Sequence, residues 1–253
     1  MERFKDKTVI VTGAASGIGR GVAERFSQEG ANVVLCDRKA DDLDKVAKEL
    51  PKERTLTQIC DVADFTQVQA LVKAAVDRFG GLDVMVNNAG IGADGNALDV
   101  SMDDWQQTLA VDLSGVFHGC RAALPELLKR EGCIVNTASV SGLGADWNMC
   151  AYNAAKGGVV NLTRSLALDF GSKGVRINAV CPSLTRTGMT EDMLKDKDLV
   201  NRFMERLPLH RVAEPADIAG VVAFLASDDA RFVNGVNLPV DGGVTASNGQ
   251  PPM

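Results

Sequence analysis

Tyr152 and Lys156 stand four residues apart in the segment CAYNAAKGG (150–158), and positions i and i+4 share one face of a helix. A phenol beside an ammonium group can give up and take back a proton, because the positive charge stabilises the phenolate. A free phenol has a pKa of about 10, and lowering it by about 3 units takes about 4 kcal/mol. An ammonium group close by, at an effective dielectric of about 20, supplies an energy of that order. An ordinary amphipathic helix produces the same spacing, so the rest of the chain must decide between the two interpretations.

A glycine-rich segment, TGAASGIGRG (12–21), follows an apolar run and opens a helical pattern. Glycine lets the backbone turn tightly and approach a pyrophosphate, which then lies at the N-terminus of the helix. The spacing G-x-x-x-G-x-G differs from the G-x-G-x-x-G fingerprint, but its place between a strand and a helix predicts dinucleotide binding. The predicted contacts are Gly13, Ser16, Gly17, Ile18 and Gly19.

An acidic residue, Asp37, ends the second apolar run, 18 residues after Gly19. A carboxylate at this place can accept hydrogen bonds from the adenosine ribose of NAD. It would also repel the 2′-phosphate of NADP. Arg38 complicates this prediction, because an arginine can pair with that phosphate, and Asp37 could instead be a helix cap or turn residue. On balance the sequence predicts NAD rather than NADP.

Seven short apolar runs alternate with segments of helical periodicity. Several runs are nearly continuous in Val and Ile, as buried parallel strands are. Strands alternating with helices imply right-handed crossovers and a parallel sheet with helices on both faces. We predict one Rossmann-type, doubly wound α/β domain over residues 1–253, with Pro239 placing the last strand at an edge. The predicted strands are 8–12, 32–36, 55–60, 83–87, 133–137, 176–181 and 235–240.

The composition argues against several classes of protein. Hydrophobic residues make up 45% of the 253 residues and charged residues 24%, which is typical of a globular chain with a sizeable core. A net charge of −6 without a basic run disfavours a nucleic-acid partner, and no apolar stretch reaches the roughly 18 residues of a membrane span. The start of the chain lacks an apolar signal segment and a cleavage site, so we expect a cytoplasmic protein. Six scattered cysteines and two distant histidines favour neither a disulfide framework nor a metal site.

Taken in order, these residues resemble the short-chain dehydrogenase/reductase family over nearly the whole chain. The resemblance rests on TGAASGIG, CDV, NNAG, YNAAK and NAVCPSLTRT, with Ser139 thirteen residues before Tyr152. It implies that Tyr152 is the acid/base and that Ser139 donates to or accepts from the substrate oxygen. It also implies that Lys156 assists Tyr152 and binds the nicotinamide ribose with its three donors. Further implied cofactor contacts, each of which could instead be an ordinary turn or strand-end residue, are Asp61, Val62, Asn88, Ala89, Gly90, Pro182 and Thr187.

Three positions depart from the family's pattern. Asp112, in LAVDLSGVF, stands where the family usually has an asparagine whose backbone carbonyl helps hold a water between the lysine and solvent. That carbonyl survives the change, so we expect a catalytic part for Asp112 in a proton relay. A carboxylate near Lys156 would offset some of the positive potential at Tyr152, which predicts an alkaline optimum for alcohol oxidation. Ser183 and Thr185 stand where glycine and an aliphatic residue are usual, and neither change removes a catalytic group.

Two segments are predicted to meet the substrate. The segment SVSGLGADWNMCAY, from Ser139 to Tyr152, contains Asp146 and Trp147, which either face a small polar substrate or lie in solvent. Residues 188–210 have a helical pattern typical either of a lid that closes over a substrate or of an ordinary amphipathic helix.

Within the family, GCIVNTASVSGLGADW, CPSLTRTGMT and PVDGGVTASNGQP are similar to the bacterial acetoin reductases, the meso-2,3-butanediol dehydrogenases. This similarity implies reversible reduction of acetoin or diacetyl with NADH. The resemblance to the family also implies a homotetramer. In the tail 244–253, Gln250 either reaches a neighbouring subunit's pocket or lies in a disordered end.

Other functions fit the same scaffold. A polyol or sugar dehydrogenase is one alternative, and a 3-oxoacyl-carrier reductase is another, although Asp37 and the acidic net charge disfavour the latter. A non-catalytic NAD-binding sensor or scaffold is the alternative from a different class. Ser139, Tyr152 and Lys156 together disfavour it. The sequence leaves the true substrate, its stereochemistry and the physiological direction open.

Overall fold

The computed structural model describes residues 2–248, and within them all seven predicted strands form one parallel sheet. The strand order is β3-β2-β1-β4-β5-β6-β7. Strands β2 and β3 therefore follow β1 on one side of the sheet. The chain then crosses over, and β4 to β7 follow in order on the other side of β1. The crevice where this order reverses is the usual ligand site of a doubly wound sheet. The strands are β1 (Thr8–Thr12), β2 (Asn32–Asp37), β3 (Thr55–Ile59), β4 (Val84–Asn87), β5 (Cys133–Thr137), β6 (Arg176–Pro182) and β7 (Asn237–Val240).

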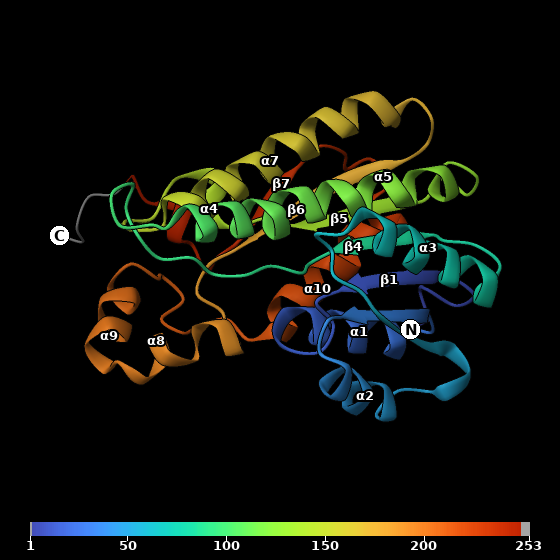
Figure 1. Cartoon of the computed structure of the whole chain (residues 1–253), viewed down its shortest axis with the longest axis horizontal. Helices are drawn as coiled ribbons and strands as arrows, with labels where there is room; N and C mark the ends of the chain where they lie inside the picture. The colour runs from blue at the N-terminus through green and yellow to red at the C-terminus, as the bar shows by residue number, and fades with distance from the viewer. Residues whose placement is uncertain (1, 249–253) are drawn as a thin grey trace.

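Helices cover both faces of the sheet (Figure 1). On one face α1 (Gly17–Gln28), α2 (Ala40–Lys48) and α10 (Pro215–Ala226) enclose a core that includes Phe26 and Ile218. On the other face the main helices are α3 (Phe65–Phe79), α5 (Gly115–Leu127) and α7 (Cys150–Gly171), and α4 (Met102–Leu109) lies beside α7. The central strands are buried between the layers, which explains their near-continuous Val and Ile content. The predicted doubly wound α/β fold is confirmed.

The edge position of β7 is also as predicted. Pro239 pairs with Cys181 of β6 on one side, and within the described residues no strand lies on the other side. A proline is tolerated there because its missing N–H faces away from the sheet. Short 3-10 helices complete the connections, at Lys52–Arg54, Gly188–Thr190, Asp228–Ala230 and Val244–Ala246.

The segment 188–210 is helical, as its pattern predicted. The helices α8 (Glu191–Lys195) and α9 (Lys197–Glu205) stand outside both layers, at the left of Figure 1. None of their residues is buried, which is compatible with a movable cover, and the lid function stays a prediction. Gln250, which was expected either to reach a neighbouring subunit's pocket or to lie in a disordered end, is outside the described residues. Within residues 2–248, no helix is long and apolar enough to cross a membrane.

A π-helical turn joins α4 to α5. It spans Ala110–Ser114, and such turns carry one extra residue and are frequent at functional sites. The turn directs the side chain of Asp112 into the protein, where it is fully buried. A second short helix, α6 (Val140–Leu143), begins directly after Ser139 and packs against α7.

Candidate active site

The predicted site residues gather at the carboxyl ends of the central strands. The glycine loop follows β1, Asp37 ends β2, and the Asn88–Gly90 segment follows β4. Ser139 follows β5, and Tyr152 and Lys156 lie on the first two turns of α7. Because the carboxyl ends of parallel strands share one edge of the sheet, segments far apart in the sequence meet there.

The glycine loop is shaped to hold a diphosphate. Gly13 and Gly17 have left-handed φ angles of 66° and 54°, a region that other residues rarely adopt. A Cβ atom on Gly19 would lie 2.1 Å from the carbonyl oxygen of Gly13, so a side chain cannot fit there. Ser16 is the N-cap of α1, and its hydroxyl makes no capping hydrogen bond. The first N–H groups of α1, which include those of Ile18 and Gly19, lack partners within the helix and suit an anion.

Asp37 is fixed beside this loop. Its carboxylate accepts hydrogen bonds from the backbone N–H of Ala15 (3.1 Å) and of Lys39 (3.1 Å). Asp37 therefore makes the turn contact that was its alternative role, while its carboxylate also borders the glycine loop. The N-cap of α2 is Lys39, not Asp37.

Arg38, which complicated the choice of cofactor, pairs with a neighbouring acid. Its guanidinium lies 3.3 Å from Oδ2 of Asp61, and the other oxygen of Asp61 accepts from the backbone N–H of Ala63 (2.9 Å). Val62 is buried beside them. The arginine is thus engaged by Asp61 through one of its nitrogens, while its side chain is 57% exposed.

The Asn88–Gly90 segment is tied to β1. The hydroxyl oxygen of Thr12 accepts hydrogen bonds from the backbone N–H groups of Asn88 (2.9 Å) and Ala89 (3.0 Å). The side chain of Asn88 donates to the carbonyl of Thr12 (3.0 Å). A Cβ atom on Gly90 would lie 3.1 Å from Oδ2 of Asp112 and 3.4 Å from Nζ of Lys156. A side chain at this position would therefore crowd the Asp112 carboxylate and press against the ammonium group of Lys156.

Lys156 is anchored beneath Tyr152. Its Nζ atom lies 5.5 Å from the centre of the Tyr152 ring and donates a hydrogen bond to the carbonyl of Thr137 (3.1 Å). The helix α6 comes close enough to position Ser139 at this end of α7, because a Cβ atom on Gly142 would lie only 2.5 Å from the carbonyl oxygen of Lys156. The arrangement places a phenol, an ammonium group and a buried serine hydroxyl around one end of the crevice.

A buried ion pair adjoins these groups. Oδ2 of Asp112 lies 3.3 Å from Nζ of Lys156, and both side chains are almost inaccessible to solvent. Oδ1 of Asp112 accepts from the backbone N–H of Ile91 (2.8 Å). Burial by itself would lower the pKa of Lys156, but the negative charge of Asp112, with a smaller contribution from Tyr152, raises the pKa above its ordinary value.

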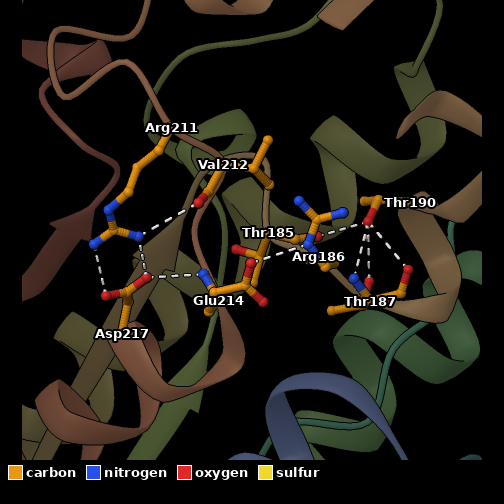
Figure 2. A network of polar contacts seen from close by, with 8 residues as sticks. All are labelled: Thr185, Arg186, Thr187, Thr190, Arg211, Val212, Glu214 and Asp217. Carbon is orange, nitrogen blue, oxygen red and sulfur yellow. Dashed lines mark hydrogen bonds and ion pairs between the residues drawn. The ribbon is translucent and has the colours of Figure 1, made fainter. Parts of the chain in front are cut away.

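A polar network holds the segment that was predicted to line the nicotinamide (Figure 2). The hydroxyl of Thr190 donates to the carbonyl of Thr185 (2.6 Å) and accepts from the backbone N–H of Thr187 (3.1 Å). This closed turn places Thr187 over the glycine loop, because a Cβ atom on Gly17 would lie 3.0 Å from its side chain. The segment starts at Pro182, the last residue of β6.

The same segment is fastened to the start of α10. Arg186 donates from its backbone to the carbonyl of Ala213 (2.8 Å) and from its side chain to Glu214 (2.9 Å). Arg211 binds both carboxylate oxygens of Asp217, and this hydrogen-bonded pair lowers the pKa of Asp217. Figure 2 shows the two halves as one continuous set of contacts.

Two departures from the family's pattern lie at the base of this network. Thr185 is buried, where an aliphatic residue is more usual, and its hydroxyl donates to the carbonyl of Ser183 (2.9 Å). The hydroxyl is thus satisfied locally and stabilises the turn after β6.

The predicted substrate residues lie at the rim. Asp146 is exposed and accepts a hydrogen bond from the hydroxyl of Ser141. The side chain of Trp147 is 91% exposed. The rim is joined across the crevice, because the backbone N–H of Gly95 donates to the carbonyl of Asn148 (2.6 Å). The contact of Asp146 and Trp147 with a substrate stays a prediction.

Sequence reasoning missed several supporting residues. Thr12, Thr137 and Thr190 act through a hydroxyl or a carbonyl and belong to no charged pattern. Asn153 accepts from the backbone N–H of Asp146 (3.2 Å) and donates to its carbonyl (2.8 Å), and its one weak signal in the sequence is its place next to Tyr152. All six cysteines are free thiols, and within residues 2–248 no cluster of three or more His, Cys, Asp or Glu side chains could hold a metal ion.

The sheet and the groups around α7 are those of a dehydrogenase on a doubly wound scaffold, and comparisons with known proteins agree. A family model described as enoyl-(acyl carrier protein) reductase matches residues 13–245. The chain belongs to the short-chain dehydrogenase/reductase family and is an oxidoreductase of the kind that uses a nicotinamide cofactor. A meso-2,3-butanediol dehydrogenase of Serratia marcescens is 53% identical to it over 249 residues, which cover 98% of each chain.

Other relatives have different names. The trans-4-hydroxycyclohexanecarboxylate dehydrogenase of Sinomonas cyclohexanicum is 39% identical over 98% of this chain and 96% of that protein. The crystal structure of a levodione reductase, 39% identical, matches with a TM-score of 0.92 over 97% of this chain and all of that one. Oxidation of an alcohol or reduction of a ketone is common to these names, whereas the substrate is not.

Proposed function

We propose that this protein interconverts acetoin, or diacetyl, and 2,3-butanediol with NAD(H). The proposed reaction type, proton and hydride transfer at an alcohol carbon, rests on the position of Lys156. Its Nζ atom donates to the carbonyl of Thr137 and lies 5.5 Å from the centre of the Tyr152 ring. The 53% identity to a meso-2,3-butanediol dehydrogenase over almost the whole chain supports the substrate.

The residues around α7 suit acid/base chemistry on a secondary alcohol. A nicotinamide dinucleotide, when bound, supplies the hydride acceptor. Tyr152 removes the hydroxyl proton of the alcohol or returns it to the carbonyl oxygen, and the positive charge of Lys156 favours its phenolate form. Ser139 fixes the substrate oxygen beside Tyr152. The π-helical turn keeps Asp112 against Lys156, where it holds the lysine in its charged form.

The fit of the dinucleotide is supported by the loop and by β2. Gly13, Gly17 and Gly19 leave a cradle that side chains would fill, at the N-terminus of α1. Asp37 borders this cradle and favours the ribose hydroxyls of NAD over the 2′-phosphate of NADP.

One alternative function has a specific observation in its favour. The description of the matching family model names an acyl-carrier reductase, so an acyl-carrier substrate is the second candidate. The net charge of −6 disfavours it, because carrier proteins of this kind are acidic and would be repelled.

We also propose a homotetramer. Large apolar side chains are exposed on helices and loops, among them Leu168 on α7 at 83% and Phe232 before β7 at 101%. Burying such residues against other copies would remove the cost of leaving them in water. Light scattering after size-exclusion chromatography measures the mass directly, and a monomer would contradict the proposal. The predicted single domain and cytoplasmic location remain predictions.

The first experiment is the oxidation of NADH by the purified protein with acetoin and with diacetyl, with NADPH as the control. Turnover with NADH and at least tenfold less with NADPH is expected, since one charge repulsion is worth a kcal/mol or more, about tenfold. Binding of NADH without turnover of either ketone would discard the substrate and keep the cofactor. Equal turnover with NADPH would discard the interpretation of Asp37.

A further inference from the structure

The loop that follows β3 borders the adenosine end of the crevice. The backbone N–H of Cys60 donates to the carbonyl of Asp37 (3.1 Å), the residue expected to meet the adenosine ribose. β3 pairs with β2 on the side away from β1. Asp61 and Val62, two of the implied cofactor contacts, therefore lie where the base of a dinucleotide would be.

One backbone donor of this loop is left over. The N–H of Asp61 donates to the side-chain oxygen of Gln67 (2.9 Å), and the N–H of Asp64 donates to the carbonyl of Asp61 (3.0 Å). Ala63 donates to Oδ1 of Asp61 (2.9 Å). Within residues 2–248, the N–H of Val62 has no acceptor. A free N–H beside a carboxylate suits the edge of adenine, where N1 accepts and the 6-amino group donates.

His118 holds this loop from α5. Its Nδ1 atom lies 2.8 Å from the carbonyl oxygen of Val62. A carbonyl oxygen only accepts hydrogen bonds, so the proton must be on Nδ1 and the imidazole donates. The ring is half-buried and lies against Phe65, with 5.4 Å between the ring centres. Contact with Phe65 thus helps to keep Nδ1 directed at the loop.

The bond from His118 fixes a whole peptide plane. The carbonyl of Val62 and the N–H of Ala63 belong to one planar unit, and the carboxylate of Asp61 accepts from that N–H. His118 and Asp61 therefore hold the two ends of the plane, and its rotation would disturb both. The helix α5 also supports Val62 by close contact, because a Cβ atom on Gly115 would lie 2.8 Å from the Val62 side chain.

We propose that His118 is a positioning residue for the adenine end of the cofactor, which keeps the N–H of Val62 and the carboxylate of Asp61 turned toward the base. This inference rests on the proposed dinucleotide-dependent function and goes further by assigning recognition of the base to a side chain of α5. A base without an acceptor at N1 gains nothing from this arrangement. The site thereby distinguishes NAD from its hypoxanthine analogue, in which N1 carries a hydrogen and an oxygen replaces the amino group.

The test compares the dissociation constants of NADH and its reduced hypoxanthine analogue, measured by fluorescence with the full chain and without an alcohol. His118→Leu removes the donor. His118→Asn keeps a donor, because the amide nitrogen of asparagine is as many bonds from Cβ as Nδ1 of histidine. Arg121→Leu is the matched control. Arg121 lies on the same face of α5, and its guanidinium contacts the ring of Phe65 (5.6 Å).

The wild type and the control are expected to bind NADH at least about tenfold more tightly than the analogue, which leaves the N–H of Val62 unpaired. In His118→Leu this ratio is expected to fall to within about threefold, because NADH binds about tenfold more weakly. In His118→Asn the ratio is expected to recover. General loosening of the fold would weaken both dinucleotides alike, so an unchanged ratio in folded His118→Leu would overturn the proposal. An asparagine variant that behaves like the leucine variant would also overturn it.

These outcomes are separate from the proposed substrate, because binding is measured without one. The expected ratios without turnover of acetoin or diacetyl would support the inference and remove the proposed substrate. Turnover of acetoin by a wild type that binds both dinucleotides equally would keep the function and overturn the inference. Absence of binding of either dinucleotide would overturn both.

Discussion

Oδ2 of Asp112 lies 3.3 Å from Nζ of Lys156, with both groups out of contact with solvent. An asparagine is usual at this position in the family that the sequence resembles, and an asparagine would present a neutral amide to the lysine. The carboxylate offsets the burial of Lys156 and raises its pKa above the ordinary value. The carboxylate also cancels part of the positive potential that Lys156 exerts on Tyr152, whose ring centre lies 5.5 Å from Nζ of Lys156. Asp112 is thus placed to tune the charge that the reaction uses.

Asp112→Asn is expected to move both limbs of the pH profile for alcohol oxidation to lower pH. Without the carboxylate, burial is no longer offset and the pKa of Lys156 falls, so the ammonium charge is lost at a lower pH and the alkaline limb moves down. Tyr152 meanwhile feels more positive potential, so the acidic limb also moves down, by about one pH unit for each 1.36 kcal/mol. The measurement is kcat/KM against pH for both proteins.

The amide keeps an oxygen for the N–H of Ile91, so the variant is expected to fold. Circular dichroism and NADH binding check this point. Superimposable acidic limbs in the two folded proteins would refute the tuning role of Asp112. Asp112→Ala serves as the contrast, because it removes the acceptor for the N–H of Ile91 as well as the carboxylate that pairs with Lys156, and is expected to cost about 3–5 kcal/mol of unfolding free energy.

Tyr152→Phe tests the proposed acid/base residue. The change removes one hydroxyl and leaves the ring that packs near Lys156. Turnover is expected to fall by about 10³-fold, within the range for loss of a general acid or base, while the dissociation constant of NADH changes by less than about threefold. Stopped-flow turnover and NADH fluorescence measure the two quantities. A variant that retains a tenth of the wild-type rate would show that Tyr152 is not the proton donor.

The sequence was sufficient to predict the sheet, because near-continuous Val and Ile runs report burial on both faces, and Pro239 marked the edge strand. It also predicted that Asp37 and the Gly13–Gly19 loop lie at the same end of the sheet, because the carboxyl ends of parallel strands meet at one edge. The sequence did not predict the turn that the hydroxyl of Thr190 closes with Thr185 and Thr187. Within residues 2–248, this hydroxyl bonds only to Thr185 and Thr187, and a threonine carries no charge pattern that would mark this role. The backbone bond from Arg186 to Ala213, 27 residues later, depends on tertiary packing.

The sequence also did not reveal the hydrogen bonds that join Ser139 to Ser141 and Ser141 to Asp146. Asp146 could be named as a polar rim residue from the sequence, but the sequence does not show which groups donate hydrogen bonds to it. These bonds appear only when the structure brings the three side chains together. The π-helical turn that buries Asp112 has no sequence signature either, since its residues fit an ordinary helix.

Asp37→Asn tests the choice of cofactor. The amide retains an oxygen for the N–H of Ala15 but loses the charge that repels a 2′-phosphate. The ratio of kcat/KM for NAD over NADP is expected to fall by at least about tenfold, chiefly through a lower KM for NADP. Asp44→Asn, an equal change of charge on the outer face of α2, is expected to leave the ratio unaltered. If the two variants behave alike, Asp37 does not discriminate between the cofactors.

Thr190→Val tests whether the network of Figure 2 presents Thr187 to the cofactor. Valine matches the shape of threonine but can neither donate to the carbonyl of Thr185 nor accept from the N–H of Thr187. Two lost hydrogen bonds of about 1 kcal/mol each are expected to weaken NADH binding by up to about 30-fold, because 1.4 kcal/mol is a factor of about ten. Trypsin is also expected to cleave faster within 188–210, because the base of α8 is released from the glycine loop.

The matched control is Thr66→Val, an exposed threonine in the first turn of α3. It is expected to change neither NADH binding nor cleavage, and this comparison separates the network from the general effect of losing a hydroxyl. Unchanged NADH affinity in Thr190→Val would mean that the fastening through Arg186 and Glu214 holds Thr187 by itself. In that case Arg186→Ala in the Thr190→Val background is expected to weaken binding where Thr190→Val does not, because it removes the side-chain bond to Glu214 and leaves only the backbone bond from Arg186 to Ala213.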